Sequence, residues 1–155
     1  MENIFQIIRD KSYDTFFSSI TNSNINIVNE NKQNLLQESI SFENYLTANF
    51  LIENDIDLNH QDSNGKTSLH YCASFNNYSI AEKILAKNGN INICDSFGNN
   101  PLWVAVFSAR GEYGLVKLFL QYGADINSKN KNNKSPLDFA MQISDELLIN
   151  ILVRR

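Results

Sequence analysis

A nine-residue phrase that returns at a nearly fixed interval constrains this chain more than any other feature of its sequence. GKTSLHYCA (65–73) recurs as GNNPLWVAV (98–106) and as NKSPLDFAM (133–141), with a weaker copy, KQNLLQESI (32–40). The anchoring leucines Leu36, Leu69 and Leu102 are 33 residues apart, and Leu137 follows after 35. A period of this length indicates stacked structural repeats, in which each unit buries its apolar face against its neighbours.

The second half of each interval repeats as well. LIENDIDLN (51–59), ILAKNGNIN (84–92) and LFLQYGADIN (118–127) each read as the last apolar turn of a helix followed by a polar reversal. Asp55, Asn88 and Gly123 stand at that reversal, where a residue with positive φ ends a helix. Pro101 and Pro136 suit the first turn of the helix that opens at the phrase. The pattern therefore predicts two short helices in each unit.

This combination resembles the ankyrin repeat, in which a turn, two antiparallel helices and a protruding loop form one unit. The resemblance covers nearly the whole chain and implies an all-α solenoid of about five units including the caps. The predicted units are 1–28 (N-terminal cap), 29–61, 62–94, 95–129 and 130–155 (C-terminal cap). Two departures stand out: the 29–61 unit lacks the glycine and the Thr-Pro of its turn, and two extra residues enter between the helices within FSARGEYG (107–114).

The reactive residues do not assemble into a recognisable enzyme or metal site. Cys72 and Cys94 are too few for a disulfide framework, and His60 and His70 have no partner at metal-ligand spacing. The sequence contains no phosphate loop, no GxSxG and no HExxH. His70 is a tempting general base, but in the ankyrin pattern this histidine fastens the loop to the helix start. We therefore expect no catalytic, cofactor or metal-binding residues.

The charge and hydropathy of the chain limit the kinds of partner it is expected to bind and the compartment in which it is expected to act. No apolar run approaches the roughly 18 residues of a membrane span, and the N-terminus lacks a secretory signal. We therefore expect a soluble, cytosolic protein with no membrane contact. The net charge of −4 is uneven: residues 1–62 hold three Lys/Arg and ten Asp/Glu (−7), and residues 63–155 hold ten and seven (+3). This distribution argues against nucleic-acid binding, which needs a broad basic face.

The resemblance implies a protein-binding surface at the loop tips and on the exposed side of the first helices. The predicted binding residues are Phe42, Lys66, Ser74, Phe75, Phe97, Asn99, Phe107, Ser108, Arg110 and Tyr113. Phe42, Phe75 and Phe107 close the first helix in three successive units, and stacking is expected to align them along the concave face. Exposed aromatic residues are typical interface anchors; the alternative is that the loop between the helices folds over each ring.

Trp103 and the insertion around Arg110 and Tyr113 each allow a structural and a binding interpretation. Trp103 replaces the histidine of the phrase, and we expect it to be wedged between loop and helix rather than free to bind. The insertion around Arg110 and Tyr113 is predicted to bulge from the edge of the solenoid. It is then either an epitope for a partner or a tolerated surface insertion.

The function hypotheses rest on resemblance and on charge. The richness in Asn, Ile, Lys and Phe is typical of an AT-rich, bacterial genome. Short, free-standing ankyrin proteins with a GNxPLWxAVF phrase resemble immunity proteins of bacterial toxin systems. This implies a monomer that binds one toxin in the cytosol and masks its active site. The acidic N-terminal half suits a basic toxin such as a nuclease, because complementary charge speeds association.

Two alternatives remain open. The chain could be a host-directed effector of an intracellular bacterium that binds a eukaryotic protein, or a pocket between units could hold a small ligand. The chain begins at Met and carries nothing beyond its repeats. We therefore expect it to act by occupying or blocking its partner, not by joining a catalytic domain to a target.

Overall fold

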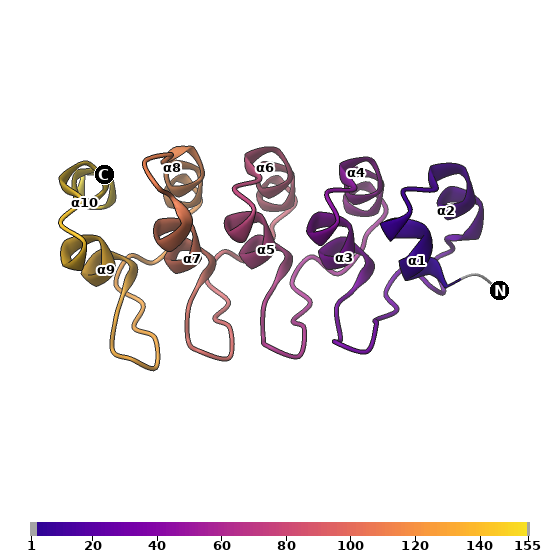
Figure 1. Cartoon of the computed structure of the whole chain (residues 1–155), viewed down its shortest axis with the longest axis horizontal. Helices are drawn as coiled ribbons and strands as arrows, with labels where there is room; N and C mark the ends of the chain where they lie inside the picture. Colours follow the sequence, from indigo (N-terminus) through magenta and orange to yellow (C-terminus); the bar gives the residue numbers. More distant parts are fainter. Residues whose placement is uncertain (1–2, 155) are drawn as a thin grey trace.

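Pairs of short helices stack side by side along one axis (Figure 1). The computed structural model describes residues 3–154. The helices of this part of the chain are α1 (Ile4–Arg9), α2 (Tyr13–Ser19), α3 (Leu35–Ser41), α4 (Tyr45–Glu53), α5 (Ser68–Ser74), α6 (Tyr78–Ala86), α7 (Pro101–Ser108), α8 (Gly114–Gln121), α9 (Pro136–Gln142) and α10 (Glu146–Val153). Each predicted unit holds one pair, and the predicted all-α solenoid is confirmed.

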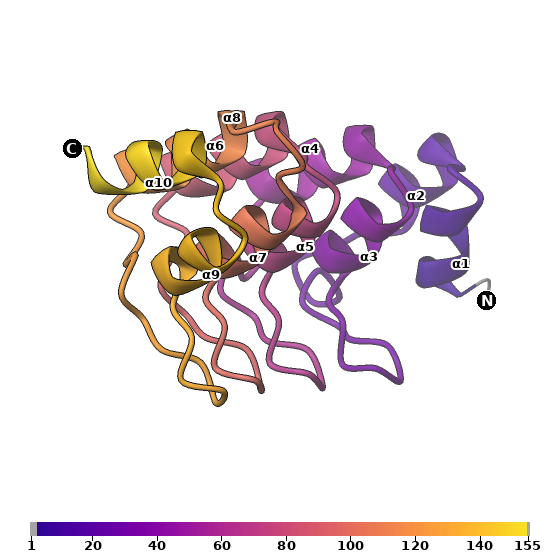
Figure 2. The same cartoon turned by 60° about the vertical axis from the view of Figure 1, so that its left-hand side comes forward.

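The long loops between successive units lie on one side of the stack, beyond the first helices α3, α5, α7 and α9 (Figures 1 and 2). Backbone hydrogen bonds join each loop to the next. The N–H of Ser63 donates to the carbonyl of Asn31 at 3.0 Å, and that of Ser96 donates to Asn64 at 2.8 Å. Lys131 donates to Phe97 in the same way at 2.9 Å. These bonds hold the loop tips in one row.

Residues with positive φ shape the turns as the sequence predicts. Asp55, Asn88 and Gly123 have φ of 58°, 64° and 79° at the reversal after the second helix. In the 62–94 unit the loop tip turns at Gly65 (φ 71°), and in the 29–61 unit Lys32 adopts the same conformation (φ 57°). The loop without glycine therefore makes the same turn, although a side chain at positive φ is less favourable there.

The core runs through the stack between the two layers of helices. Leu36, Leu69 and Leu102 are each 0% exposed, because a neighbouring unit covers each side of them. The last unit differs on its outer face. Met141 is 60% exposed, whereas its counterpart Val106 in the preceding unit is 2% exposed. A terminal unit usually has a polar outer face, and this one retains apolar side chains there.

Reciprocal hydrogen bonds cap the first helices. In the 29–61 unit the N–H of Gln37 donates to Oδ1 of Asn34 at 3.0 Å, and the N–H of Asn34 donates to Oε1 of Gln37 at 2.9 Å. Ser135 and Asp138 form the same capping box in the last unit. Such pairs satisfy amide groups that have no partner inside the helix.

His70 has the structural role that the sequence predicts. The N–H of Thr67 donates to Nδ1 at 3.0 Å, so Nδ1 carries no proton and Nε2 donates to the carbonyl of Asn99 at 2.9 Å. The ring is 0% exposed and ties its own helix start to the next loop. Gln37 does the same in the preceding unit, where its Nε2 donates to the carbonyl of Lys66 at 2.7 Å.

We predict that His70 makes stability fall between pH 7 and pH 5. Burial lowers the pKa of His70 below its ordinary value of 6.5. The unfolded chain therefore binds the proton at a higher pH than the folded chain does. The stabilisation is complete above pH 6.5 and is lost as the pH falls through the folded-state pKa. Urea unfolding of wild type and His70→Gln at both pH values checks this. Glutamine should flatten the dependence, and an unchanged pH slope in His70→Gln would contradict the assignment.

Candidate protein-binding surface

The surface predicted to bind a partner is built by the exposed residues of the first helices and by the loop tips, which we call the first-helix face. Its positions are most easily compared by counting from the anchor leucine of each unit. Three positions of each unit line this row: +2 (Glu38, Tyr71, Val104, Phe139), +5 (Ser41, Ser74, Phe107, Gln142) and +6 (Phe42, Phe75, Ser108, Ile143).

Phe42, Phe75 and Phe107 do not form the regular row that was expected. Phe42 and Phe75 follow α3 and α5 as the residues that cap them, and they are 43% and 46% exposed. Phe107 is 59% exposed but lies inside α7, one position earlier in its unit. Ser108 takes the position of Phe75 there and is the last residue of α7. All three rings meet solvent, so the loops between the helices do not fold over them.

Phe42 already has a partner inside the chain. The guanidinium of Arg9, at the end of α1, lies 5.3 Å from the centre of the Phe42 ring. Its Nε donates to Oε1 of Glu38 at 2.5 Å, and Nδ2 of Asn29 donates to the other oxygen at 3.1 Å. Glu38 is 1% exposed, so this carboxylate is buried with its charge compensated. Phe42 is therefore the least available of the three rings.

Phe107 belongs to an aromatic cluster with Trp103 and Phe139. Its ring stacks on Trp103 with centroids 5.4 Å apart and planes 12° apart, and it lies 5.4 Å from Phe139 at 49°. Trp103 is half-buried, and its Nε1 is buried without a hydrogen-bond partner. The cluster connects α7 to α9 and presents the face of Phe107 to solvent. Trp103 thus packs against the exposed ring of Phe107. The sequence predicted that Trp103 is wedged between loop and helix, and it did not predict this contact.

Hydrogen bonds fix the predicted residues of the loop tips, and the exposure of their side chains differs from one residue to the next. Phe97 is 60% exposed, yet its N–H donates to Oδ1 of Asp95 at 2.9 Å. The side chain of Asn99 accepts from Asn130 Nδ2 at 2.8 Å, which joins two loops. Lys66 is half-buried, and its N–H donates to Oδ1 of Asp62 at 2.9 Å. Of these residues, Phe97 offers the most free surface to a partner.

The remaining predicted residues lie near the ends of the first helices. Ser74 is exposed, and its hydroxyl donates to the carbonyl of His70 at 3.1 Å. Ser108 is half-buried. Arg110 is exposed and has a φ of 45° in the insertion.

The insertion is bonded to both neighbouring units and does not bulge freely. The hydroxyl of Tyr113 donates to Oδ2 of Asp145 at 2.6 Å, and Nδ2 of Asn76 donates to Oε2 of Glu112 at 2.7 Å. The bond from Tyr113 lowers the pKa of Asp145 below its ordinary value. Tyr113 is half-buried against the core, so this side chain has a structural role, and Arg110 is the more accessible of the two predicted residues.

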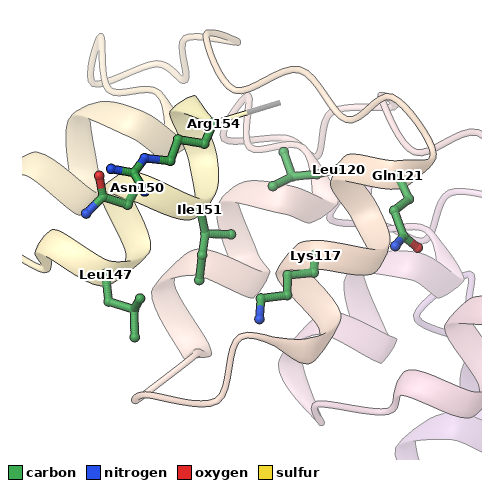
Figure 3. A pocket seen from close by; sticks show the side chains of 7 residues that line it. All are labelled: Lys117, Leu120, Gln121, Leu147, Asn150, Ile151 and Arg154. Atoms are coloured by element: carbon green, nitrogen blue, oxygen red, sulfur yellow. The ribbon is translucent and has the colours of Figure 1, made fainter.

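A groove that the sequence did not predict lies between α8 and α10, on the side of the second helices (Figure 3). Its volume is about 610 Å³, and its lining combines Leu120, Leu147 and Ile151 with Lys117 and Arg154. Leu147 is 61% exposed. The apolar run LLINILV (147–153) was the available signal, but helical spacing alone does not tell an exposed leucine from a buried one. None of the predicted binding residues lines this groove.

Neither a metal-ion cluster nor a membrane-spanning helix is present in the described part of the chain. Within residues 3–154, no group of three or more His, Cys, Asp and Glu side chains is placed to hold a metal ion. The same residues include no helix that is both long and apolar enough to span a bilayer. Cys72 is 0% exposed, and burial raises the pKa of its thiol.

Comparisons with known proteins agree with the architecture. A family model described as ankyrin repeats (three copies) matches residues 4–93 and 75–154. An ankyrin repeat-containing protein of Saccharomyces cerevisiae is 32% identical over 95 residues, which are 57% of this chain and 52% of the yeast protein. An ankyrin repeat protein of Rickettsia felis is 33% identical over 99 residues, or 58% of this chain and 43% of that protein.

A third relative is much longer than this chain. A delta-latroinsectotoxin of Latrodectus tredecimguttatus is 38% identical over 84 residues, which are 53% of this chain and 7% of the toxin. The chain therefore spans about half or less of the length of each of these three relatives.

Proposed function

The chain belongs to the ankyrin-repeat family, whose repeats are protein-interaction modules, and on that premise we propose that it is a cytosolic immunity protein that binds and inhibits one cognate bacterial toxin. In this proposal it acts as a monomer that covers the active site of the toxin. The observation that carries the proposal is the pair of rings on the first-helix face, Phe75 and Phe107, which are 46% and 59% exposed. Exposed rings of this kind are frequent anchors of protein interfaces.

Charge supports a basic partner. Residues 1–62 carry a net charge of −7, and the two middle loops each hold a carboxylate at the base of the loop, Asp62 and Asp95. These carboxylates are 7% and 8% exposed. The corresponding residues of the flanking loops, Asn29 and Asn130, are neutral. A basic toxin such as a nuclease would therefore meet its most favourable potential over the acidic N-terminal half, up to the loop of Asp62.

The test is co-purification with the product of the neighbouring upstream gene, followed by an assay of the activity of that product. We expect a complex that survives gel filtration and a loss of toxin activity at equimolar protein. Association should slow as salt is raised, because charge steers the encounter. The proposal fails if that product is not a toxin and does not bind. Capture of a eukaryotic protein instead would support the host-directed effector.

A further inference from the structure

Side chains of the first-helix face reach from one unit to the next in a repeated way. At the two outer junctions, the side chain at +5 of one unit contacts the side chain at +2 of the following unit. Arg9 occupies +5 of the first unit, counted from Ile4, and it bonds Glu38 at +2 of the second. Phe107 occupies +5 of the fourth unit, and its ring lies 5.4 Å from that of Phe139 at +2 of the fifth. Both outer junctions are therefore filled by the chain itself.

The middle junctions have serine at +5. The hydroxyl of Ser41 donates to the carbonyl of Gln37 at 2.9 Å, and that of Ser74 donates to His70 at 3.1 Å. Each serine is thus bonded to its own helix and is too short to cross to the next unit. In the repeat register, Ser41 corresponds to Arg9, and the residues of the next unit that correspond to Phe42 and Glu38 are Phe75 and Tyr71. Phe75 is 46% exposed, and Tyr71 is half-buried. We call Ser41, Tyr71 and Phe75 the Phe75 slot.

The Phe75 slot is backed by negative charge. The hydroxyl of Tyr71 donates to Oδ2 of Asp62 at 2.6 Å, and Nε2 of Gln33 donates to the Tyr71 oxygen at 2.8 Å. The tyrosine oxygen already accepts from Gln33, so a further donor would share this oxygen with that amide. Burial, followed by the bond to Asp62, raises the pKa of Tyr71, so the phenol stays protonated. The charge of Asp62 also makes the tyrosine oxygen a stronger acceptor.

We propose that the Phe75 slot binds an arginine side chain of a protein partner. The guanidinium would lie on the Phe75 ring as the guanidinium of Arg9 lies on Phe42, 5.3 Å from the ring centre. One of its N–H groups would donate to the Tyr71 oxygen, in the place where Arg9 donates to Glu38. A planar guanidinium stacks on a ring and donates at the same time, which the ammonium of lysine does less well. That a protein partner supplies the arginine rests on the proposed function. The presence of the slot does not depend on that function.

The second middle junction does not offer the same site. There the +2 and +6 residues of the unit that follows Ser74 are Val104 and Ser108, so the junction lacks both a ring at +6 and a hydroxyl at +2. The arginine site is therefore specific to the junction between the second and third units.

A small probe tests the slot without any partner. The probe is the blocked peptide acetyl-Gly-Arg-Gly-amide, and acetyl-Gly-Gln-Gly-amide is its neutral match. Nuclear magnetic resonance of the aromatic side chains reports binding of each peptide to the full chain. We expect saturable shifts of the Phe75 and Tyr71 resonances with the arginine peptide and much smaller ones with the glutamine peptide. Equal shifts with both peptides, no shifts, or shifts confined to other rings would overturn the proposal.

Three variants sharpen the experiment. Ser41→Arg places an arginine at +5, as Arg9 is placed in the first unit, and should reduce the shifts to the level of the glutamine peptide. Phe75→Leu keeps an apolar side chain without the ring and should weaken binding about two- to fivefold, the range of an exposed cation–ring contact. The matched control Phe42→Leu should leave the peptide affinity unchanged, because Arg9 already covers that ring.

The outcomes separate this inference from the proposed function. The peptide can bind at the Phe75 slot even if no toxin is found, which would support the slot and remove the proposed partner. A toxin can also bind the first-helix face while Ser41→Arg and Phe75→Leu leave the arginine peptide unaffected, which would remove the slot alone.

Discussion

Replacing Phe119 with alanine should lower the free energy of unfolding by about 3–5 kcal/mol. The ring lies in α8, the second helix of the fourth unit, and is 0% exposed. Removing the ring leaves a cavity between the two layers of helices. This cavity cannot close fully, because the neighbouring units hold the helices apart. The total stability of a small domain is about 5–15 kcal/mol, so the loss is a large share of it. Urea unfolding followed by circular dichroism measures it.

Exposed phenylalanines provide the matched controls. Phe75→Ala should cost less than about 1 kcal/mol, since surface substitutions change stability little. Phe107→Ala should cost more, about 0.5–1.5 kcal/mol, because the ring stacks on Trp103 and Phe139. If Phe75→Ala destabilised the chain as much as Phe119→Ala, Phe75 would be part of the core and unavailable to a partner.

The double variant Phe75→Ala/Phe107→Ala should weaken partner binding by about 2–6 kcal/mol. Each ring is expected to contribute about 1–3 kcal/mol as an interface anchor, and the two lie in different units, so their effects should add approximately. Titration calorimetry with the purified partner measures the change. The control is Tyr122→Ala/Leu147→Ala, which removes two exposed side chains of 43% and 61% on the second-helix side. A comparable loss in the control would place the interface on that side.

The fold could be predicted because its determinants are local and repeated. The phrase around Leu69 and Leu102 fixes where each first helix begins, and the reversals at Asn88 and Gly123 fix where each second helix ends. Each unit mostly contacts its neighbours, so a local pattern is enough to give the architecture. Even the irregular loop at Lys32 follows, because its neighbours hydrogen-bond to it and impose its conformation.

The surface could be predicted only in part, because it depends on which side chains meet across a junction. The residue types suggested equal roles for Phe42, Phe75 and Phe107. The structure separates them: Arg9 lies over Phe42, while Phe107, one position earlier in its unit than Phe75, stacks on Trp103. Arg9 is distant in sequence from Phe42, so no local pattern pairs them. Likewise, no pattern around Tyr113 indicates its bond to Asp145.

Site-specific photo-crosslinking tests most directly the central claim, that the first-helix face contacts the partner. A benzoylphenylalanine placed at Phe75 probes this face, and one placed at Tyr122 probes the second-helix side, where the native ring is similarly exposed at 43%. The account predicts a covalent adduct with the partner from position 75 and none from position 122. An adduct from position 122 with none from position 75 would contradict it.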